Sequence, residues 1–350
     1  MKFFDRIRIY LAALLALFAL SVWGLVIGSR PVSNEPRLIS VTVDRGASAR
    51  QVADVLKTAH LIRSTTVFVL TCRLTGEGSK LKPGVYGVSK SMSVQQLIHH
   101  LVSGETIEAK LTIPEGYTIR QIADELQTRQ FATSDSFVRL TLTQGFQFPN
   151  SAFLFGHNLE GYLFPDTYLF QRGADINNIV ETMLSNFQRK VVRPYKADIE
   201  KVGKERFGLG PDKFNDSLYK ILIMASLVER EARLAKDRPV IAAVLWNRLK
   251  KHIRLEICAT VSYIPGESRE NKAKVYVVDT KSVSPYNTYQ IYGLPPTPIC
   301  NPGIASIKAV MNPANVDYLY YVAKGDGGHI FSRTFKEHLA AKKAVETSVK

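Results

Sequence analysis

Cysteine is scarce in this chain of 350 residues. The three cysteines, Cys72, Cys258 and Cys300, lie far apart, and no C-x-x-C pair occurs. This scarcity excludes a dense disulfide framework and argues against a zinc site. The sequence also lacks G-x-S-x-G, H-E-x-x-H and P-loop patterns, which are the signatures of serine hydrolases, zinc peptidases and nucleoside triphosphatases. No residue spacing implies a metal or an organic cofactor.

Acidic residues are also in short supply. Asp and Glu number 31 against 46 Lys and Arg, which gives a formal net charge of +15. A polyanionic partner is one explanation, and ordinary solvation of the surface is an equally good one. With 45% hydrophobic and 22% charged residues, the composition is that of a globular protein. The length suits two or three domains.

Only one long apolar run is present. Residues 9–28 carry no charge, follow a basic tail at 1–8, and precede a linker at 29–38. Twenty helical residues span about 30 Å, the thickness of a bilayer core. A cleaved signal peptide would have a shorter apolar region and a better cleavage site than Gly28-Ser29-Arg30. We therefore expect a single-pass inner-membrane protein with its N-terminus in the cytoplasm and its bulk outside, where nucleic acid is not a partner.

An internal repeat organises the front of the extracytoplasmic part. Residues 41–58 align without gaps on residues 111–128, with eight of the eighteen positions identical. Each copy reads as a short strand, a glycine turn, a Ser48 or Thr118 N-cap and an amphipathic helix. We expect a LysM-like βα module at 39–108, which would either bind glycans or act as a spacer.

The rest of the chain divides at a charged stretch. Between Lys190 and Lys213 the sequence has little apolar periodicity. We expect an intermediate, substrate-groove subdomain at 109–213, a catalytic subdomain at 214–345, and a cleft between these two lobes. The predicted fold class is α+β, with a helical lobe carrying the acid.

Two glutamates occupy an otherwise apolar helix predicted over residues 219–235. On a helical wheel Glu229 shares its stripe with the small residues Ala225, Ser226 and Ala232, which would leave room for a ligand. Burial favours the protonated form of such a carboxyl, so Glu229 is a candidate proton donor. Glu231 lies on a bulkier stripe and is expected to be a core carboxylate with an arginine partner.

Three polar and aromatic blocks follow that helix. They cover residues 284–289, 293–303 and 324–334, and prolines and glycines fix their shape. Flat rings suit stacking on sugars, and amides or hydroxyls can recognise sugar hydroxyls. The candidate substrate-binding residues in these blocks are Tyr286, Asn287, Tyr289, His329 and Ser332.

These blocks, in this order, resemble the YceG-like endolytic murein transglycosylases (the MltG family). The resemblance covers nearly the whole chain, from IPEGYTIRQIADEL at 113–126 through LEGYLFPDTY at 159–168, ASLVEREA at 225–232, VLWNRL at 244–249, SPYNTY, GLPPTPICNPG and YLYYVAKGDGGHIFS at 318–332, to EHLAA at 337–341.

The resemblance implies cleavage of the MurNAc–GlcNAc β-1,4 bond of nascent peptidoglycan strands, without water. It assigns Glu229 as the acid that protonates the leaving oxygen and then takes the proton of the muramoyl 6-hydroxyl, giving a 1,6-anhydro end. Strand termination and partnership with cell-wall synthases would follow.

One block departs from the family pattern. Where the family reads Leu-Gln-x-Asp-Pro-Thr-Val-x-Tyr, this chain has Glu256 and Cys258 at the Gln and Asp positions, while Thr260, Val261 and Tyr263 are kept. Glu256 and Thr260 join the candidate substrate-binding residues.

The departure leaves alternatives open. The chain could be a weakened enzyme that serves as a glycan-binding scaffold, or a hydrolase that pairs Glu229 with Glu256 or Glu160. A disulfide between Cys258 and Cys300 is a further hypothesis.

Overall fold

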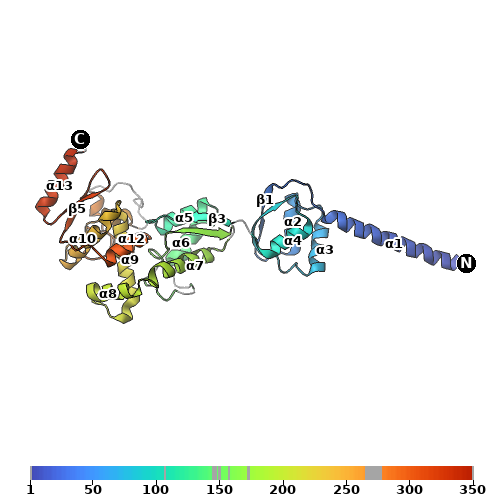
Figure 1. Cartoon of the computed structure of the whole chain (residues 1–350), viewed down its shortest axis with the longest axis horizontal. Coiled ribbons are helices and arrows are strands. Elements are labelled where there is room, and N and C mark those ends of the chain that lie inside the picture. The colour runs from blue at the N-terminus through green and yellow to red at the C-terminus, as the bar shows by residue number, and fades with distance from the viewer. Residues whose placement is uncertain are drawn as a thin grey trace. The chain divides into compact units, whose positions relative to one another are not determined.

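The computed structural model describes residues 2–105, 108–143, 148, 151–156, 158–171, 174–264 and 278–348. It is a mixed α+β structure with helices and three two-stranded sheets among these residues (Figure 1). The chain forms two compact units. The first comprises residues 1–110 and 169–174, and the second comprises 111–168 and 175–350.

The first unit begins with the helix α1 (Lys2–Ser29). Its remaining elements are β1 (Leu38–Val43), α2 (Ala49–Thr58), α3 (Thr65–Thr75), β2 (Gly84–Ser89) and α4 (Val94–Ser103). β1 and β2 pair in antiparallel fashion, from Leu38 opposite Ser89 to Val43 opposite Gly84. The helices cover this sheet (Figure 1) and close a core that includes Leu56, Phe68, Tyr86 and Leu97, each fully buried.

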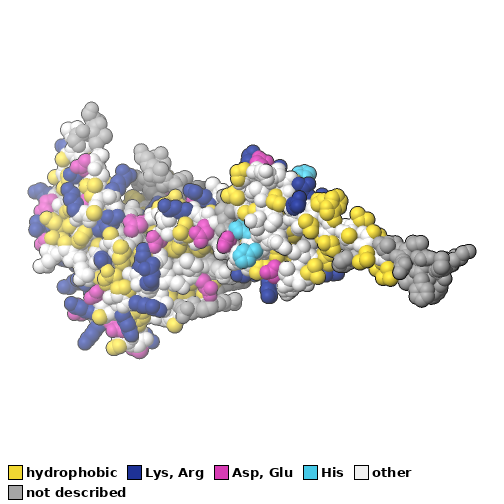
Figure 2. Space-filling model, turned by 45° about the vertical axis from the view of Figure 1, so that its right-hand side comes forward, with side chains coloured by type: hydrophobic (Ala, Val, Ile, Leu, Met, Phe, Trp, Pro, Cys, Tyr) yellow, Lys and Arg dark blue, Asp and Glu magenta, His cyan; other side chains and the backbone are white. Residues whose placement is uncertain are grey.

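The end of α1 packs against α3, because a Cβ atom at Gly28 would lie only 2.6 Å from Val67 Cγ2. Leucines along the preceding part of α1 are exposed, and Figure 2 shows these hydrophobic side chains gathered along the helix. Within the described residues, none of the helices reaches the combined length and hydropathy that crossing a bilayer requires.

Both copies of the repeat fold as expected. After β1, Gly46 has a φ of 75°, a conformation that favours glycine, and Ser48 then caps α2. Ser48 accepts from the Gln51 N–H, while the Gln51 side chain accepts from the Ser48 N–H. In the second copy Gly116 has a φ of 81°, and Thr118 and Gln121 form the same capping box at the start of α5 (Ile119–Thr128). The shared local sequence therefore produces the same helix start twice.

A short sheet and several helices come next along the chain. β3 (Glu108–Thr112) pairs with β4 (Thr167–Gln171), and the boundary between the two units falls within both strands. The helices that follow in the second unit are α6 (Ser134–Thr143), α7 (Ile176–Phe187), the π-helical turn Gln188–Val192 and α8 (Lys196–Phe207). Residues 190–213 thus contain a helix that packs on the next one, inside the second unit. The expected subdivision at residue 213 stays a prediction.

The long helix α9 (Phe214–Glu231) is the centre of this unit. All of its residues from 217 to 228 except Lys220 are buried, as the apolar sequence predicts. α9 packs against α8, α10 (Arg238–Lys250) and α12 (Ile304–Met311) (Figure 1). The remaining elements are the 3-10 turns Pro211–Lys213, Ala235–Asp237 and Asp279–Lys281, α11 (Cys258–Ser262), the antiparallel hairpin of β5 (Tyr320–Ala323) and β6 (His329–Ser332), and α13 (Phe335–Ser348).

Lys and Arg side chains do not form a single stripe on the face shown in Figure 2. On this face they are interspersed with Asp and Glu. The distribution seen there is that of a solvated surface and does not outline a track for an extended polyanion.

Candidate active site

Glu229 lies in the last turn of α9 and is held by two donors. The backbone N–H of Gly303 donates to Glu229 Oε2 at 3.0 Å, and Arg238 Nη2 lies 3.5 Å from Oε1. Gly303 is the N-cap residue of α12, so the carboxylate also lies at the positive end of a helix. The Glu229 side chain is 6% exposed, which leaves a small part of it open to solvent. Two donors therefore contact the Glu229 carboxyl, and a small part of the side chain remains exposed.

A second carboxylate, Glu115, lies beside the first. It belongs to the loop between β3 and α5, and a Cβ atom built on Gly303 would lie 1.9 Å from Glu115 Oε1. Only glycine at position 303 permits this approach. Burial raises the pKa of Glu115, the negative charge of Glu229 raises it further, and Arg238 opposes both effects. The two carboxyl groups and Arg238 therefore form one electrostatic unit.

Glu115 is absent from the candidates predicted from sequence, although the repeat contains a signal for it. In the gapless alignment Glu115 corresponds to Arg45, within the otherwise similar strand, turn and helix. The residue directly before the shared glycine is therefore basic in the first copy and acidic in the second. The fold then brings Glu115 to Glu229, which is 114 residues away in sequence.

A buried polar network fixes the loops around these carboxylates. Glu160, 2% exposed, accepts hydrogen bonds from the Ile119 N–H, Asn301 Nδ2 and the Tyr263 hydroxyl, the last two at 3.0 Å. Asn301 Oδ1 accepts from the N–H groups of Gly161 and Leu163. The backbone of Asn301 also pairs with the loop of Glu115, since the Gly116 N–H donates to its carbonyl at 2.9 Å. This network joins three loops far apart in sequence.

The stripe of small residues on α9 is covered at Ser226 by another part of the protein, which leaves no space for a ligand there. This side chain is fully buried and its hydroxyl accepts from the Ile299 N–H at 3.0 Å. The thiol of Cys300 lies 3.5 Å from the Ser226 carbonyl oxygen. The expectation of free space beside this stripe was therefore wrong at Ser226, because a loop from residues 299–303 packs there.

Glu231 is partly buried, and its hydrogen-bond partner is a tyrosine instead of the expected arginine. The Tyr321 hydroxyl donates to Glu231 Oε2 at 3.1 Å. Burial raises the pKa of Glu231, and the Tyr321 hydrogen bond and the nearby His329 act in the opposite direction. Glu231 and Glu229 thus have different partners, although they are two residues apart.

The block at 284–289 is held together by its own hydrogen bonds. Asn287 is fully buried and donates through Nδ2 to the carbonyl oxygens of Thr280 and Ser282, while its Oδ1 accepts from the Tyr289 N–H. Tyr286 shares a hydrogen bond with Thr297, 3.0 Å between the oxygens. These contacts shape the loop, and they occupy the polar atoms of Asn287.

The residues of the departing block are also engaged. Glu256 Oε2 lies 2.9 Å from Arg248 Nη1, and Glu256 has a φ of 55°. Thr260 is fully buried and its hydroxyl lies 3.0 Å from that of Thr288. Cys258 is a free, exposed cysteine whose Sγ lies 3.1 Å from the Tyr289 hydroxyl.

Cys300 is free and buried, so the hypothetical disulfide between Cys258 and Cys300 is absent. Their surroundings give the reason, because each sulfur contacts a different part of the structure.

The last two candidates lie on β6. His329 Nδ1 is 2.9 Å from Asp237 Oδ2, and both side chains are nearly buried at 4% and 7% exposed. Ser332 is buried, and its carbonyl oxygen accepts from the Leu319 N–H. The structure therefore packs both side chains inside the protein. Neither takes part in the described hydrogen bonds or ion pairs of Glu229.

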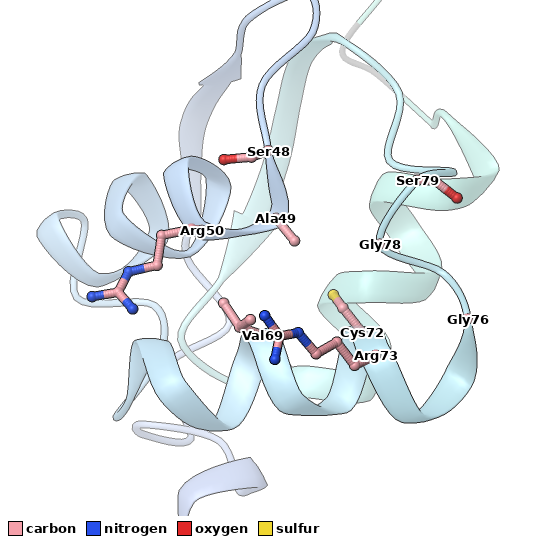
Figure 3. A pocket seen from close by; sticks show the side chains of 9 residues that line it. All are labelled: Ser48, Ala49, Arg50, Val69, Cys72, Arg73, Gly76, Gly78 and Ser79. Atoms are coloured by element: carbon pink, nitrogen blue, oxygen red, sulfur yellow. The ribbon is translucent and has the colours of Figure 1, made fainter.

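The first unit has a shallow pocket of its own, of about 390 Å³. Figure 3 shows it between the start of α2 and the end of α3, with the Arg50 guanidinium directed away from Cys72. The Ser48 hydroxyl is engaged with Gln51, and burial raises the pKa of Cys72 to about 11, so this thiol stays protonated at neutral pH. No three His, Cys, Asp or Glu side chains come together to hold a metal ion in the described parts of either unit.

Together these features define a mixed α+β protein in which a carboxyl at a helix end lies beside a second carboxyl from a loop and an arginine. Residues 41–344 match the model of the YceG-like family, and the chain belongs to that family.

Named relatives agree with this assignment. The chain is 33% identical over 327 residues to the endolytic murein transglycosylase of Bacillus subtilis (strain 168), covering 89% of this chain and 86% of the relative. It is 28% identical to the endolytic murein transglycosylase of Streptococcus pneumoniae (strain D39), of which it covers 60%.

Among solved structures, it is similar to the 2.6 Å crystal structure of a putative YceG-like protein from Listeria monocytogenes. The TM-score is 0.57 at 31% identity, over 87% of this chain and 99% of that one.

The polar network yields a prediction on stability. Asn301→Ala would leave the Gly161 and Leu163 N–H groups without their acceptor and remove a donor to Glu160. We expect the free energy of unfolding in urea to fall by about 2–4 kcal/mol. The control Asn315→Ala, at an exposed position, should change it by less than about 0.5 kcal/mol. An equal effect of the two substitutions would contradict the role of the network.

A second prediction concerns Glu115. Because its pKa is raised on folding, the wild type loses stability as pH rises from the ordinary glutamate value through the raised value. Glu115→Gln removes this loss, so the variant should gain stability relative to the wild type between pH 4 and pH 7. Chemical denaturation at both pH values measures the difference. A relative stability that falls with pH would show that Glu115 is instead held ionised.

Proposed function

We propose that this chain is an endolytic murein transglycosylase in which Glu229 serves as both acid and base. The placement of Glu229 between the Gly303 N–H, Arg238 and Glu115 is the observation that carries the proposal. Two relatives that cover 89% of the chain bear that name.

The chemistry proposed for Glu229 begins with proton donation. The protonated carboxyl gives its proton to the glycosidic oxygen between MurNAc and GlcNAc, and the bond from C1 to that oxygen breaks. The resulting carboxylate is stabilised by the Gly303 N–H and by Arg238. It then accepts the proton of the muramoyl 6-hydroxyl as that oxygen bonds to C1, which gives the 1,6-anhydro end. The acid is regenerated and no water is consumed.

Glu115 fits the first half of this cycle. Burial and the negative charge of Glu229 raise the pKa of Glu115, so a proton on Glu115 is held more readily beside Glu229. Arg238 limits this effect and favours the carboxylate once the proton has been given away. The arrangement suits a group that must release a proton and recover it within a single reaction.

The hydrolytic alternative receives little support from these contacts. Glu160 is buried and hydrogen-bonded to three different groups, and Glu256 pairs with Arg248. Neither contacts Glu229 in a described hydrogen bond or ion pair. A glycan-binding scaffold without activity remains the second candidate, because Glu256 and Cys258 replace the residues usual in the family.

We also propose that the protein is anchored in the cytoplasmic membrane by residues 9–28, with residues 39–108 forming a LysM-like module outside. The uncharged run and the continuous helix α1 support the anchor. The order of β1, α2, α3 and β2, with antiparallel pairing of the strands, supports the module. From this position the enzyme would terminate strands beside the cell-wall synthases.

The anchor is tested by membrane association. The full chain should float with phospholipid vesicles and resist extraction by carbonate, whereas a chain lacking residues 2–29 should stay in the dense bottom fraction. Both are assayed by flotation on a density gradient. If the full chain also remained unbound, the anchor proposal would be rejected while the site at Glu229 would be unaffected.

The activity is tested at Glu229. Glu229→Gln cannot donate a proton, so cleavage of peptidoglycan strands should fall at least ~100-fold. Mass spectrometry of the wild-type products should find 1,6-anhydro ends. Glu181→Gln, on α7, is the matched control and should cleave like the wild type. Products with reducing ends would favour the hydrolase, and absence of cleavage by the wild type would favour the scaffold.

A further inference from the structure

A large cavity lies on the second unit, away from Glu229. Its volume is about 880 Å³, and it is bordered by the end of α8, by Lys220 of α9, by α10 and by the loops at 293–294 and 313–316. This size lies in the range of sites for small molecules and short peptides. Nothing in the proposed mechanism uses it.

The cavity and Glu229 lie on opposite faces of α9. Lys220 and Glu229 are nine residues apart, which corresponds to about 180° around the helix axis and ~13 Å along it. A ligand in the cavity would therefore not contact the catalytic carboxyl. Substitutions at one site can thus test it without altering the other.

Two of the cavity's cations are supported by aromatic rings. The Arg206 guanidinium lies over the Trp246 ring, 4.9 Å from its centroid, and the Lys220 ammonium lies 5.5 Å from that of Phe207. The two rings pack on each other with centroids 5.0 Å apart. This support reduces the freedom that the cations would lose on binding a ligand. Lys220 also lies 3.4 Å from Asp216, so its charge is partly compensated.

The rings themselves are poorly suited to stacking on a sugar. Trp246 is only 6% exposed, its Nε1 donates to the Val310 carbonyl, and Arg206 covers one of its faces. Stacking requires an open ring face. The chemistry of the cavity therefore favours a charged ligand over a neutral glycan.

The remaining lining suits a peptide. Arg206, Lys220 and Lys250 are spread over α8, α9 and α10, so they match several separate carboxylates better than a single phosphate. Among the described lining residues Glu205 is the sole acid, and its carboxylate could pair with one amine of a ligand. Leu249, Leu294 and Val316 provide contacts for methyl groups. Asn247 holds the 313–316 loop in place by donating to the Val316 carbonyl at 2.9 Å.

We propose that this cavity is an accessory binding site for a short peptide that carries at least two carboxylates and one amine. The peptide stems of murein are the source that the proposed function makes available, and this choice of source rests on that function. The site would hold a peptide-bearing strand while Glu229 acts elsewhere on the molecule.

Trp246 provides the readout. In a Trp23→Phe background of the full chain in mild detergent, Trp246 is the remaining tryptophan of the sequence, and its fluorescence reports on Arg206. The probe is alanyl-γ-glutamyl-lysyl-alanyl-alanine with an acetylated N-terminus. It should change the fluorescence saturably, and the same peptide with both carboxylates amidated should bind at least tenfold more weakly. Chitotetraose and inorganic phosphate should bind more weakly than the peptide.

Variants separate this site from the catalytic one. The double substitution Arg206→Gln and Lys250→Gln should weaken peptide binding at least tenfold and leave cleavage of peptide-free glycan unchanged. Lys201→Gln, on the exposed surface of α8, is the matched control and should bind normally. Glu229→Gln should bind the peptide like the wild type while losing cleavage.

Three results would overturn the inference: no peptide binding at millimolar concentration, equal binding by the double variant, or tighter binding of chitotetraose or phosphate than of the peptide. None of these outcomes would affect the cleavage assay, so failure of this site is distinguishable from failure of the proposed function.

Discussion

The hydrogen bonds between Asn301 and Glu160 are the interaction on which the site depends. Asn301 is fully buried and uses its side-chain amide and its backbone to join the loop after Glu115, the loop after Glu160, and the loop that ends at Gly303. Buried polar groups of this kind cost free energy unless each is satisfied, so the three loops are held in one arrangement. That arrangement places the Gly303 N–H and Glu115 next to Glu229.

The electrostatics of the site follow from this placement. Two carboxyl groups lie close together with one arginine and one backbone donor, and burial adds to their mutual repulsion at Glu115. A pair of this kind holds a proton more readily than an isolated, solvated carboxylate does. Transglycosylation needs a group that gives a proton and recovers it, which a single carboxyl can do when the substrate supplies the nucleophile. Among the described contacts, no second carboxylate faces Glu229 from the opposite side. This agrees with a reaction that uses a single carboxyl.

The helix α9 carries both Glu229 and a residue of the cavity. Its buried residues pack against α8, α10 and α12, so its last turn is fixed where Glu229 leaves the core. Its first half contributes Lys220 to the cavity on the opposite face. Because one rigid helix carries both, a ligand in the cavity and a strand at Glu229 would keep a constant separation. This geometry connects the accessory peptide site to the proposed reaction without any conformational change.

The sequence by itself determined the local elements and the buried helix that carries Glu229. The capping residues Ser48 and Thr118 set the same helix start in both copies of the repeat, and the apolar run around Glu229 required a buried helix, because both depend on neighbours in sequence. Only the tertiary structure decided that Glu115 lies beside Glu229 and that a loop packs on the small-residue stripe at Ser226. It also decided that the polar atoms of Asn287 and Glu256 bind other groups of the protein. These outcomes depend on contacts between loops that are distant in sequence and on the hydrogen bonds that buried polar groups must make. Local periodicity in the sequence encodes neither of them.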